Sequence, residues 1–326
     1  MYALLYENVR KYHSLVFCGI CDNRLREKLY MDFLYKISTL CDIMLGKIGL
    51  NFTRLSHKET VHKFVYRFAD DIQNSFREYS SKKDNYTIWV FWAQGKSKMP
   101  NVVRNCYESI LRNKGDFSVV LLDESNYSDY VCIPEHVCKK MQQGLITMTH
   151  FSDILRFALL KTYGGFWLDA TIYVTSTIEM PSTLFTIRQK GCSDYISSNR
   201  WCGFLWYAPQ GHPLASFCYS FLCEYWRKYN ELVDYFLMDY IIEYFYNSSS
   251  AFKREIDELP CSNRYLYFFQ SVNCEALYDD VIWHKMCQET QFFKTTWKKI
   301  YLKKENGCET YYGEILGHGI DNNTGI

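Results

Sequence analysis

The sequence predicts an α/β fold in which a buried parallel sheet follows a helical region. Residues 87–92, TIWVFW, form the dense apolar run that is typical of a strand covered on both faces. A helical pattern, NVVRNCYESILRN, starts after Pro100, and a second apolar run, FSVVLL, occupies residues 117–122. A strand, a helix and a strand at this spacing indicate a right-handed crossover unit. In such sheets ligands bind at the carboxyl ends of the strands, which here means residues 92–95 and the loop that begins at Asp123.

The stretch from residue 150 to residue 175, HFSDILRFALLKTYGGFWLDATIYVT, predicts a helix followed at once by a strand. Ser152 stands where a helix cap is expected, and the apolar residues after it recur at helical spacing. Gly164 and Gly165 predict the end of the helix, because glycine adopts the left-handed backbone conformation that closes helices. The strand that follows is interrupted by Asp169 and continues to its end with strong strand formers.

One charged pair, Asp153 and Arg156, stands in this helix ahead of Lys161. The two residues are three positions apart, so they share one helical face. An apolar helix that keeps charged side chains needs a partner or a ligand for them, because burial of an uncompensated charge is costly. Two interpretations follow, a salt bridge between the two residues or a polar site to which both contribute.

Composition excludes several classes of protein. The chain has 326 residues, of which 48% are apolar and 18% aromatic, so it is not a disordered protein. A net charge of +1 argues against general nucleic-acid binding, and no nucleic-acid partner is expected. The sequence shows neither an apolar run long enough to span a membrane nor a secretory leader, so we expect a soluble, cytoplasmic protein.

Fourteen cysteines are scattered along the chain, and reduced, mostly buried thiols are expected in this compartment. Cys18 and Cys21 are spaced like half of a zinc or redox site. No second pair of this kind and no histidine-rich partner accompanies them in the sequence, so we interpret them as ordinary thiols.

A change of pattern divides the chain into two regions. In residues 1–84 apolar side chains recur at three- and four-residue steps, which predicts a helical N-terminal region. Its basic side chains favour the solvated face of a helical cap over a membrane contact, because charges of both signs alternate. The polar segment SSKKDN, residues 80–85, predicts the boundary. Residues 85–326 then form the α/β domain, with a helical elaboration over about 210–305.

Two further features come from the second half of the chain. Asp239 lies inside an apolar and aromatic helical pattern, VDYFLMDYII, as a core or capping residue or as a contact to an acceptor. Residues 294–304 carry five lysines around Trp297 and Tyr301. A solvated basic face explains them, and attraction to anionic lipid is the alternative.

The segments WVFWAQG, LLDESNY, SDILR and GGFWLDAT, in this order, resemble the capsular-polysaccharide-synthesis type of glycosyltransferase. That type is related to mannosyl- and galactosyltransferases that carry a DXD motif. The resemblance covers residues 87–215 and continues weakly through VDYFLMDYII and FFKTTWKK. It implies a GT-A fold, which is a Rossmann-like nucleotide-sugar-binding domain.

The resemblance also implies a donor site for a nucleotide sugar. Trp92 is expected to stack on the nucleotide base, while Asp153 and Arg156 are expected to face the donor sugar and its diphosphate. A carboxylate accepts hydrogen bonds from sugar hydroxyls, and a guanidinium offsets phosphate charge. The residues expected in this donor site are Trp92, Gln94, Gly95, Ser152, Asp153, Arg156, Gly165 and Asp169.

A divalent cation is the expected cofactor, since in relatives two acids hold the ion that bridges the diphosphate. Asp169 matches the first acid, whereas Thr171 stands in the place of the second. Mg²⁺ needs only one or two carboxylates when phosphates and waters complete its shell. We therefore expect Mn²⁺ or Mg²⁺ at Asp169 and Thr171, with His318 closing the site from the C-terminal segment. Transfer without a metal ion is the alternative, because a hydroxyl is a poorer ligand than a carboxylate.

The implied reaction is transfer of a hexose of the galactose, glucose or mannose class from a UDP-linked sugar. The acceptor is expected to be a hydroxyl of a lipid-linked capsule or O-antigen precursor, with retention of configuration and a peripheral contact at the cytoplasmic membrane. Asp169, Arg156 and Asp239 are the expected catalytic residues, because positioning and stabilisation of the leaving diphosphate dominate such chemistry. The alternative is a non-catalytic glycan-binding or scaffold member of the same fold.

Overall fold

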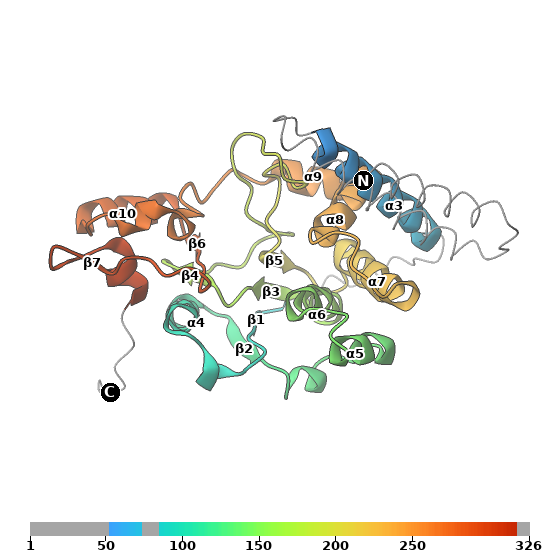
Figure 1. The fold of residues 1–326 in the computed structure, drawn as a ribbon, viewed down its shortest axis with the longest axis horizontal. Coiled ribbons are helices and arrows are strands. Elements are labelled where there is room, and N and C mark those ends of the chain that lie inside the picture. The colour runs from blue at the N-terminus through green and yellow to red at the C-terminus, as the bar shows by residue number, and fades with distance from the viewer. Residues whose placement is uncertain (1–51, 74–84, 318–326) are drawn as a thin grey trace, which may run out of the picture. The chain divides into compact units, whose positions relative to one another are not determined.

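The structure is a computed structural model that describes residues 52–73 and 85–317 (Figure 1). The chain divides into two compact units, residues 1–67 and residues 68–326. Helix α3, Phe52–Gln73, falls within the predicted helical region. The rest of that region, with Cys18 and Cys21, and most of the predicted boundary segment lie outside the described residues.

A four-stranded sheet forms the centre of the second unit. Its strand order is β2-β1-β3-β5, in which β1 runs parallel to both neighbours and β5 runs antiparallel to β3. Helix α4, Asn101–Asn113, links β1 to β2 as the predicted crossover. The predicted α/β class is therefore confirmed, and the parallel-rich sheet agrees with the expected GT-A fold. The strands are β1 Thr87–Phe91, β2 Ser118–Leu122, β3 Gly165–Leu168 and β5 Leu205–Ala208.

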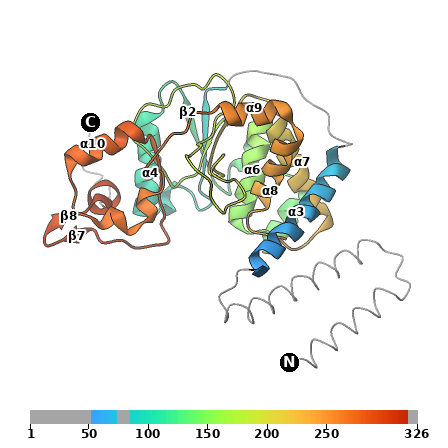
Figure 2. The same cartoon turned by 90° about the horizontal axis from the view of Figure 1, so that it is seen from above.

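Helices cover both faces of the sheet, with α4 on one side and α6, Met148–Thr162, on the other (Figures 1 and 2). Side chains of a strand point alternately to its two faces, so each strand supplies both cores. Toward α4 the sheet presents Ile88, Val90, Phe166 and Leu168. Toward α6 it presents aromatic rings, with Trp89 against Tyr163, Phe91 against Phe151 and Trp167 beneath the guanidinium of Arg156. Burial on both faces explains the continuous apolar runs in the sequence.

A second layer of helices packs on α6, as Figure 1 shows. Helix α7 lies against α6, and α5 and α8 pack on α7. Four helices, α7, α8, α9 and α10, Asp280–Glu289, lie in the region 210–305 where a helical elaboration is expected. The helices of this layer are α5 Glu135–Gln142, α7 Pro213–Lys228, α8 Leu237–Ser248 and α9 Ser250–Glu258.

The C-terminal segment builds a second core against α4. Buried aromatic side chains of this segment, among them Phe269, Trp283 and Phe293, pack with Val102 and Cys106 of α4. The segment comprises α10 Asp280–Glu289, β6 Phe292–Lys294, β7 Lys304–Glu305, β8 Cys308–Glu309 and the π-helical turn η5 Gly313–Gly317. The short 3-10 turns of the unit are η1 Lys96–Lys98, η2 Tyr127–Asp129, η3 Phe268–Gln270 and η4 Val272–Glu275.

The strand expected to continue through Asp169 is in fact two strands in two sheets. After β3 the chain makes a tight turn, in which the amide of Ile172 donates to the carbonyl of Asp169 at 3.0 Å. Strand β4, Ile172–Val174, then pairs with β6 rather than with the central sheet. The turn leaves the Asp169 side chain at the end of β3, next to the start of the two-stranded sheet formed by β4 and β6.

Helix α6 begins one turn earlier than the sequence predicted, and its cap is Thr147 rather than Ser152. The Thr147 hydroxyl oxygen accepts a hydrogen bond from the amide of His150 at 3.2 Å. Ser152 therefore lies inside the helix, where its hydroxyl donates to the carbonyl of Thr149 at 2.6 Å. A serine inside a helix commonly donates a hydrogen bond to a carbonyl of the preceding turn in this way. Ser152 is therefore an internal residue of the helix and not its cap.

The described residues show no disulfide, and their cysteines are free. Burial is mixed, with five buried, four exposed and two in between, so the expectation of mostly buried thiols holds only in part. The part of the chain that the structure describes also contains no helix long and apolar enough to cross a membrane.

The glycine pair after α6 is required by close backbone contacts. Gly164 and Gly165 have φ values of +72° and +94°, a region that L side chains rarely adopt. A Cβ atom on Gly165 would lie 2.4 Å from the carbonyl oxygen of Thr87 in β1. The helix therefore ends where the chain must pass within backbone contact of the neighbouring strand.

We expect Gly165→Ala to destabilise the protein by more than about 2 kcal/mol, since positive φ and a backbone clash act together. Gly144→Ala is the matched control, because Gly144 has φ of +73° but nothing within 4 Å of an added Cβ. The control should lose only about 1 kcal/mol. Urea unfolding of both variants measures the difference, and equal losses would show that the contact with Thr87 is unimportant.

Candidate functional site

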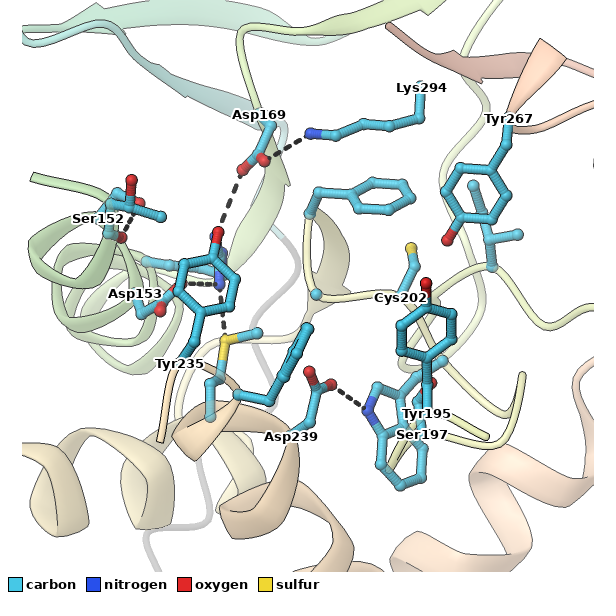
Figure 3. A pocket seen from close by; sticks show the side chains of 18 of the residues that line it. Ser152, Asp153, Asp169, Tyr195, Ser197, Cys202, Tyr235, Asp239, Tyr267 and Lys294 are labelled. Atoms are coloured by element: carbon cyan, nitrogen blue, oxygen red, sulfur yellow. Dashed lines mark hydrogen bonds and ion pairs between the residues drawn. The ribbon is translucent and has the colours of Figure 1, made fainter. Parts of the chain in front are cut away.

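A cavity of about 680 Å³ opens at the carboxyl end of β3, between α6 and the start of α8 (Figure 3). Its charged lining comes from separate parts of the sequence. Strand β3 delivers Asp169 to the floor, α6 delivers Asp153 and Arg156, α8 delivers Asp239 and β6 delivers Lys294. The position agrees with the rule that parallel sheets bind ligands at the carboxyl ends of their strands.

Arg156 joins the two acidic motifs of the sequence. Its Nη1 donates to Oδ1 of Asp153 at 2.8 Å, and its Nη2 donates to Oδ1 of Asp169 at 3.3 Å (Figure 3). The guanidinium is buried and lies 5.0 Å from the centre of the Trp167 ring. A buried cation needs such partners, because an uncompensated charge is expensive to remove from water. The salt bridge between Asp153 and Arg156 therefore exists, and it is part of a larger site that includes Asp169.

Lys294 binds the other oxygen of Asp169. Its ammonium lies 2.8 Å from Oδ2 of Asp169 and donates to the hydroxyl oxygen of Thr171 at 2.8 Å. Trp167 Nε1 adds a hydrogen bond to Oδ1 at 2.9 Å. Burial raises the pKa of Asp169, but the charges of Lys294 and Arg156 outweigh that effect and hold the pKa below its usual value. The carboxylate is thus ionised and enclosed by donors.

Asp239 lines the opposite side of the cavity and accepts a hydrogen bond from Trp201 Nε1 at 2.9 Å (Figure 3). Burial raises the pKa of Asp239 to about 6, and the hydrogen bond from Trp201 opposes that shift only partly. An acid with this pKa exchanges a proton near neutral pH, which is the property that a general acid or base needs.

Aromatic side chains form much of the remaining lining of the cavity, and we call them the aromatic wall. Its members are Tyr195, Trp201, Tyr235, Phe236 and Tyr267. Tyr195 and Tyr235 are 62% and 66% exposed although they have large rings, and Phe236 contacts both. Exposed aromatic rings beside a polar cavity provide flat apolar surface together with hydroxyl groups, which suits a ligand that has both kinds of face.

The residues expected at the nucleotide base form a neighbouring feature outside the cavity lining. Trp92 follows β1 and contacts Trp297 edge to face, with ring centres 5.7 Å apart. Its Nε1 is buried and has no hydrogen-bond partner among the described residues. Gln94 is exposed, and Gly95 has φ of +77° in the turn that closes on Trp92. Because Trp297 is three residues after Lys294, one short segment reaches both Trp92 and the cavity.

Gly165, also expected in the donor site, lies at the opposite end of β3 from Asp169. The separation along a strand of this length is roughly 13 Å, so its backbone is remote from the cavity floor. Its contact with Thr87 explains the glycine without a ligand. Ser152 does line the cavity, beside Asp153.

Two of the three residues expected to hold a divalent cation lie within the described part of the chain. Asp169 and Thr171 both bind the ammonium of Lys294, and His318 lies outside the described residues. Within residues 52–73 and 85–317 no three histidine, cysteine, aspartate or glutamate side chains are grouped so that they would hold a metal ion. The described oxygens of Asp169 and Thr171 thus already have an ammonium group as their partner.

Sequence reasoning missed Lys294 and the aromatic wall. Lys294 was grouped with four other lysines as a basic surface, although it directly follows the apolar pair Phe292 and Phe293. That pair predicts a short buried strand, and a lysine at its end is the available signal for a partner inside the protein. The aromatic residues come from irregular loops and from the start of α8, where no periodic pattern marks which side they face.

Comparison with known proteins gives relatives that match over part of their length. O-glycosyltransferase braB of Annulohypoxylon truncatum is 33% identical over 101 residues, which is 28% of this chain and 24% of that protein. Glycosyltransferase afumC of Aspergillus fumigatus is 29% identical over 125 residues, 33% of this chain and 31% of that protein. The matches thus span about a quarter to a third of these curated relatives.

Among solved structures, the PaToxG glycosyltransferase covers 62% of this chain and 80% of its own, with 12% identity and a TM-score of 0.38. That likeness is too low to carry an argument. A family model described as capsular polysaccharide synthesis protein matches residues 46–315, which include every described residue of the cavity and of the central sheet. The chain therefore belongs to the capsular polysaccharide synthesis protein family.

Proposed function

We propose that the protein transfers a hexose from a nucleotide-diphosphate sugar, UDP-linked, to a hydroxyl of a surface polysaccharide precursor, with retention of configuration. The observation that carries the proposal is the cavity floor, where Asp153, Arg156, Asp169 and Lys294 form one connected network. Family membership and the two glycosyltransferases that match in part support the same reaction class.

In this proposal the donor lies along the segment from Trp92 to the cavity. Trp92 and Trp297 receive the base, and the buried Nε1 of Trp92 gains the acceptor that it lacks among the described residues. The diphosphate lies against Lys294 and Arg156, whose cations offset its charge. Asp153 accepts hydrogen bonds from hydroxyls of the donor sugar.

During transfer the bond between the sugar anomeric carbon and the diphosphate oxygen breaks, and its electron pair stays on that oxygen. A new bond forms between the anomeric carbon and the acceptor oxygen on the same face that the diphosphate leaves, as retention requires, and the acceptor hydroxyl gives up its proton. We assign that proton to Asp239, because burial raises its pKa to about 6 and it lines the same cavity. Preorganised cations at the leaving diphosphate stabilise the charge that develops there.

The acceptor occupies the aromatic side of the cavity. Sugar rings have an apolar face and a hydroxyl-bearing edge, and Tyr195 and Tyr235 provide exposed rings for the former. Trp201 holds Asp239 toward the same space through its hydrogen bond. A lipid-linked oligosaccharide enters this side with its reacting hydroxyl near Asp239.

A membrane contact is proposed for the loop between β6 and β7. Ile300 is 95% exposed there, and Lys298 and Lys299 are exposed beside it. Lys303 and Lys304 are exposed as well, but they already bind protein groups, the carbonyl of Gly317 and the carboxylate of Glu309. The apolar tip and its two lysines therefore form the part that suits an anionic lipid surface.

The test of the function is acceptor-dependent transfer from a panel of nucleotide sugars. We expect product only when both donor and glycan acceptor are present, and we expect Asp169→Asn to lower turnover by about 100-fold or more, since it removes the charge that organises two cations. Asp280→Asn, an exposed acid on α10, is the control that should keep full turnover. Nucleotide binding without transfer to any acceptor would favour a glycan-binding or scaffold role.

Asp239→Asn should lower transfer while it stabilises the fold. The native pKa of about 6 exceeds the ordinary value of 3.8, so the folded protein loses stability as pH rises between these values. Asparagine removes that penalty and still accepts from Trp201, which adds up to about 3 kcal/mol at neutral pH. Urea unfolding at about pH 7 and about pH 4 measures the gain, which should vanish at the lower pH.

Wild-type transfer should rise with pH through about 6 as Asp239 loses its proton. If Asp239→Asn transferred the sugar at the wild-type rate, Asp239 would not be the proton acceptor, whatever the effect of the substitution on stability.

The membrane contact is tested by flotation with lipid vesicles. At low salt we expect retention on vesicles rich in anionic phosphatidylglycerol and release from neutral phosphatidylcholine, because the attraction is electrostatic. Replacing both Lys298 and Lys299 by glutamate should abolish retention. Absence of wild-type retention on anionic vesicles would refute this contact and leave the transfer reaction untouched.

A further inference from the structure

We propose that the ammonium of Lys294 takes the place of a divalent cation, so that the protein binds the diphosphate of its donor without a metal ion. The inference rests on the proposed donor site and says how that site neutralises phosphate charge. It starts from the disagreement between the metal ligands expected from the sequence and the contacts that these residues make.

The oxygens that would bind a metal ion are already bound to cations. Oδ2 of Asp169 lies 2.8 Å from the Lys294 ammonium, and Oδ1 lies 3.3 Å from Nη2 of Arg156. The Thr171 hydroxyl oxygen accepts from the same ammonium at 2.8 Å. A divalent ion needs these oxygens at about 2.0–2.6 Å, which would bring it against Lys294 at a separation where like charges repel strongly.

The remaining acids of the cavity do not supply a replacement ligand set. Asp153 faces Arg156 and also lies 3.5 Å from Nδ1 of His150. Asp239 accepts from Trp201, and burial raises its pKa. A hard cation requires several ionised oxygen ligands in one place, whereas the ionised carboxylates here are turned toward basic side chains.

Lys294 restores the charge that a metal site would have. Two carboxylates with one divalent cation have no net charge, and neither do one carboxylate and one ammonium. A site with Thr171 in place of the second acid and Lys294 in place of the divalent ion therefore has the same net charge as a metal site with two acids. A diphosphate that approaches meets a neutral pair with a cation on its exposed side, as it would in a metal site.

The position of the ammonium is fixed by strand pairing. Lys294 ends β6 and lies opposite Ile172 of β4, next to Thr171 in the chain. Its amide donates to the carbonyl of Leu266 at 2.7 Å, and its side chain is 15% exposed where it reaches the cavity. An ammonium has three N–H donors, and Asp169 with Thr171 uses two of them. The ammonium also lies 4.5 Å from the centre of the Phe204 ring, and we assign the third donor to a phosphate oxygen in the cavity.

The chemistry of transfer needs no additional reactant. As the bond between the anomeric carbon and oxygen breaks, the electron pair ends on the diphosphate, and the cations of Lys294 and Arg156 face that charge. No electron is lost or gained by the protein. A preorganised ammonium stabilises developing phosphate charge in the same manner as a bound ion, although with a smaller charge.

Calorimetric titration of the full chain with UDP, GDP, ADP and dTDP tests the proposal. Each nucleotide is titrated once in EDTA and once with Mn²⁺. For the nucleotide that binds, we expect the dissociation constants measured in the two buffers to agree within about threefold. Transfer should likewise persist in EDTA.

Variants of Lys294 identify the residue responsible. Lys294→Met should weaken nucleotide binding about tenfold or more in EDTA, because it removes a charge-assisted contact. Lys294→Glu places a second carboxylate beside Asp169, so binding should become dependent on Mn²⁺. Lys285→Met, an exposed lysine on α10, is the matched control and should bind as the wild type does. Circular dichroism melting confirms that each variant folds.

The outcomes separate this inference from the proposed function. Nucleotide binding by the wild type only with Mn²⁺, or unchanged binding by Lys294→Met, overturns the role of Lys294 and leaves glycosyl transfer intact. No binding of any nucleotide in either buffer overturns the donor site itself. The titrations of the wild-type protein in EDTA and in Mn²⁺ need no variant, so they decide the question even if a substitution prevents folding.

Discussion

The buried guanidinium of Arg156 is the constraint on which the site depends. A charge removed from water must be matched within the protein, and Arg156 is matched by Asp153 on its own helix and by Asp169 beyond the next strand. The contact with Asp169 links α6 to the end of β3. The polar cavity is thus a consequence of how one cation is compensated, and Lys294 extends the same network to the C-terminal segment.

Much of the fold follows from local sequence patterns. The apolar runs predicted β1 and β2, the helix between them began after Pro100 as expected, and the glycine pair ended α6. The failures came from pairing between distant segments. Nothing in residues 171–175 shows that they leave the central sheet for β6, because strand formers look alike whichever partner they join. Thr147 caps α6 although serine is the slightly better capping residue, so the residue types alone pointed to the wrong position.

In the candidate site, too, some residues could be predicted from the sequence and others could not. The resemblance implied one site for Asp153, Arg156 and Asp169, and the structure brings the three residues to one cavity. The resemblance supplied Trp92, whose contact with Trp297 no spacing rule predicts. The sequence does not distinguish Lys294 from the neighbouring lysines, because only the conformation of the backbone decides which of these side chains points inward. Its strand turns it inward, whereas Lys298 and Lys299 remain outside.

The pairing of Asp169 with Lys294 joins residues that are 125 positions apart. During synthesis the central sheet, α6 and their acids leave the ribosome long before the lysine that balances them. Until β6 docks on β4, Asp169 has Arg156 and Trp167 as donors but lacks the ammonium of Lys294. The charges of the cavity floor are therefore complete only after β6 has paired with β4, so a chain that ends before Lys294 lacks one cation of that floor.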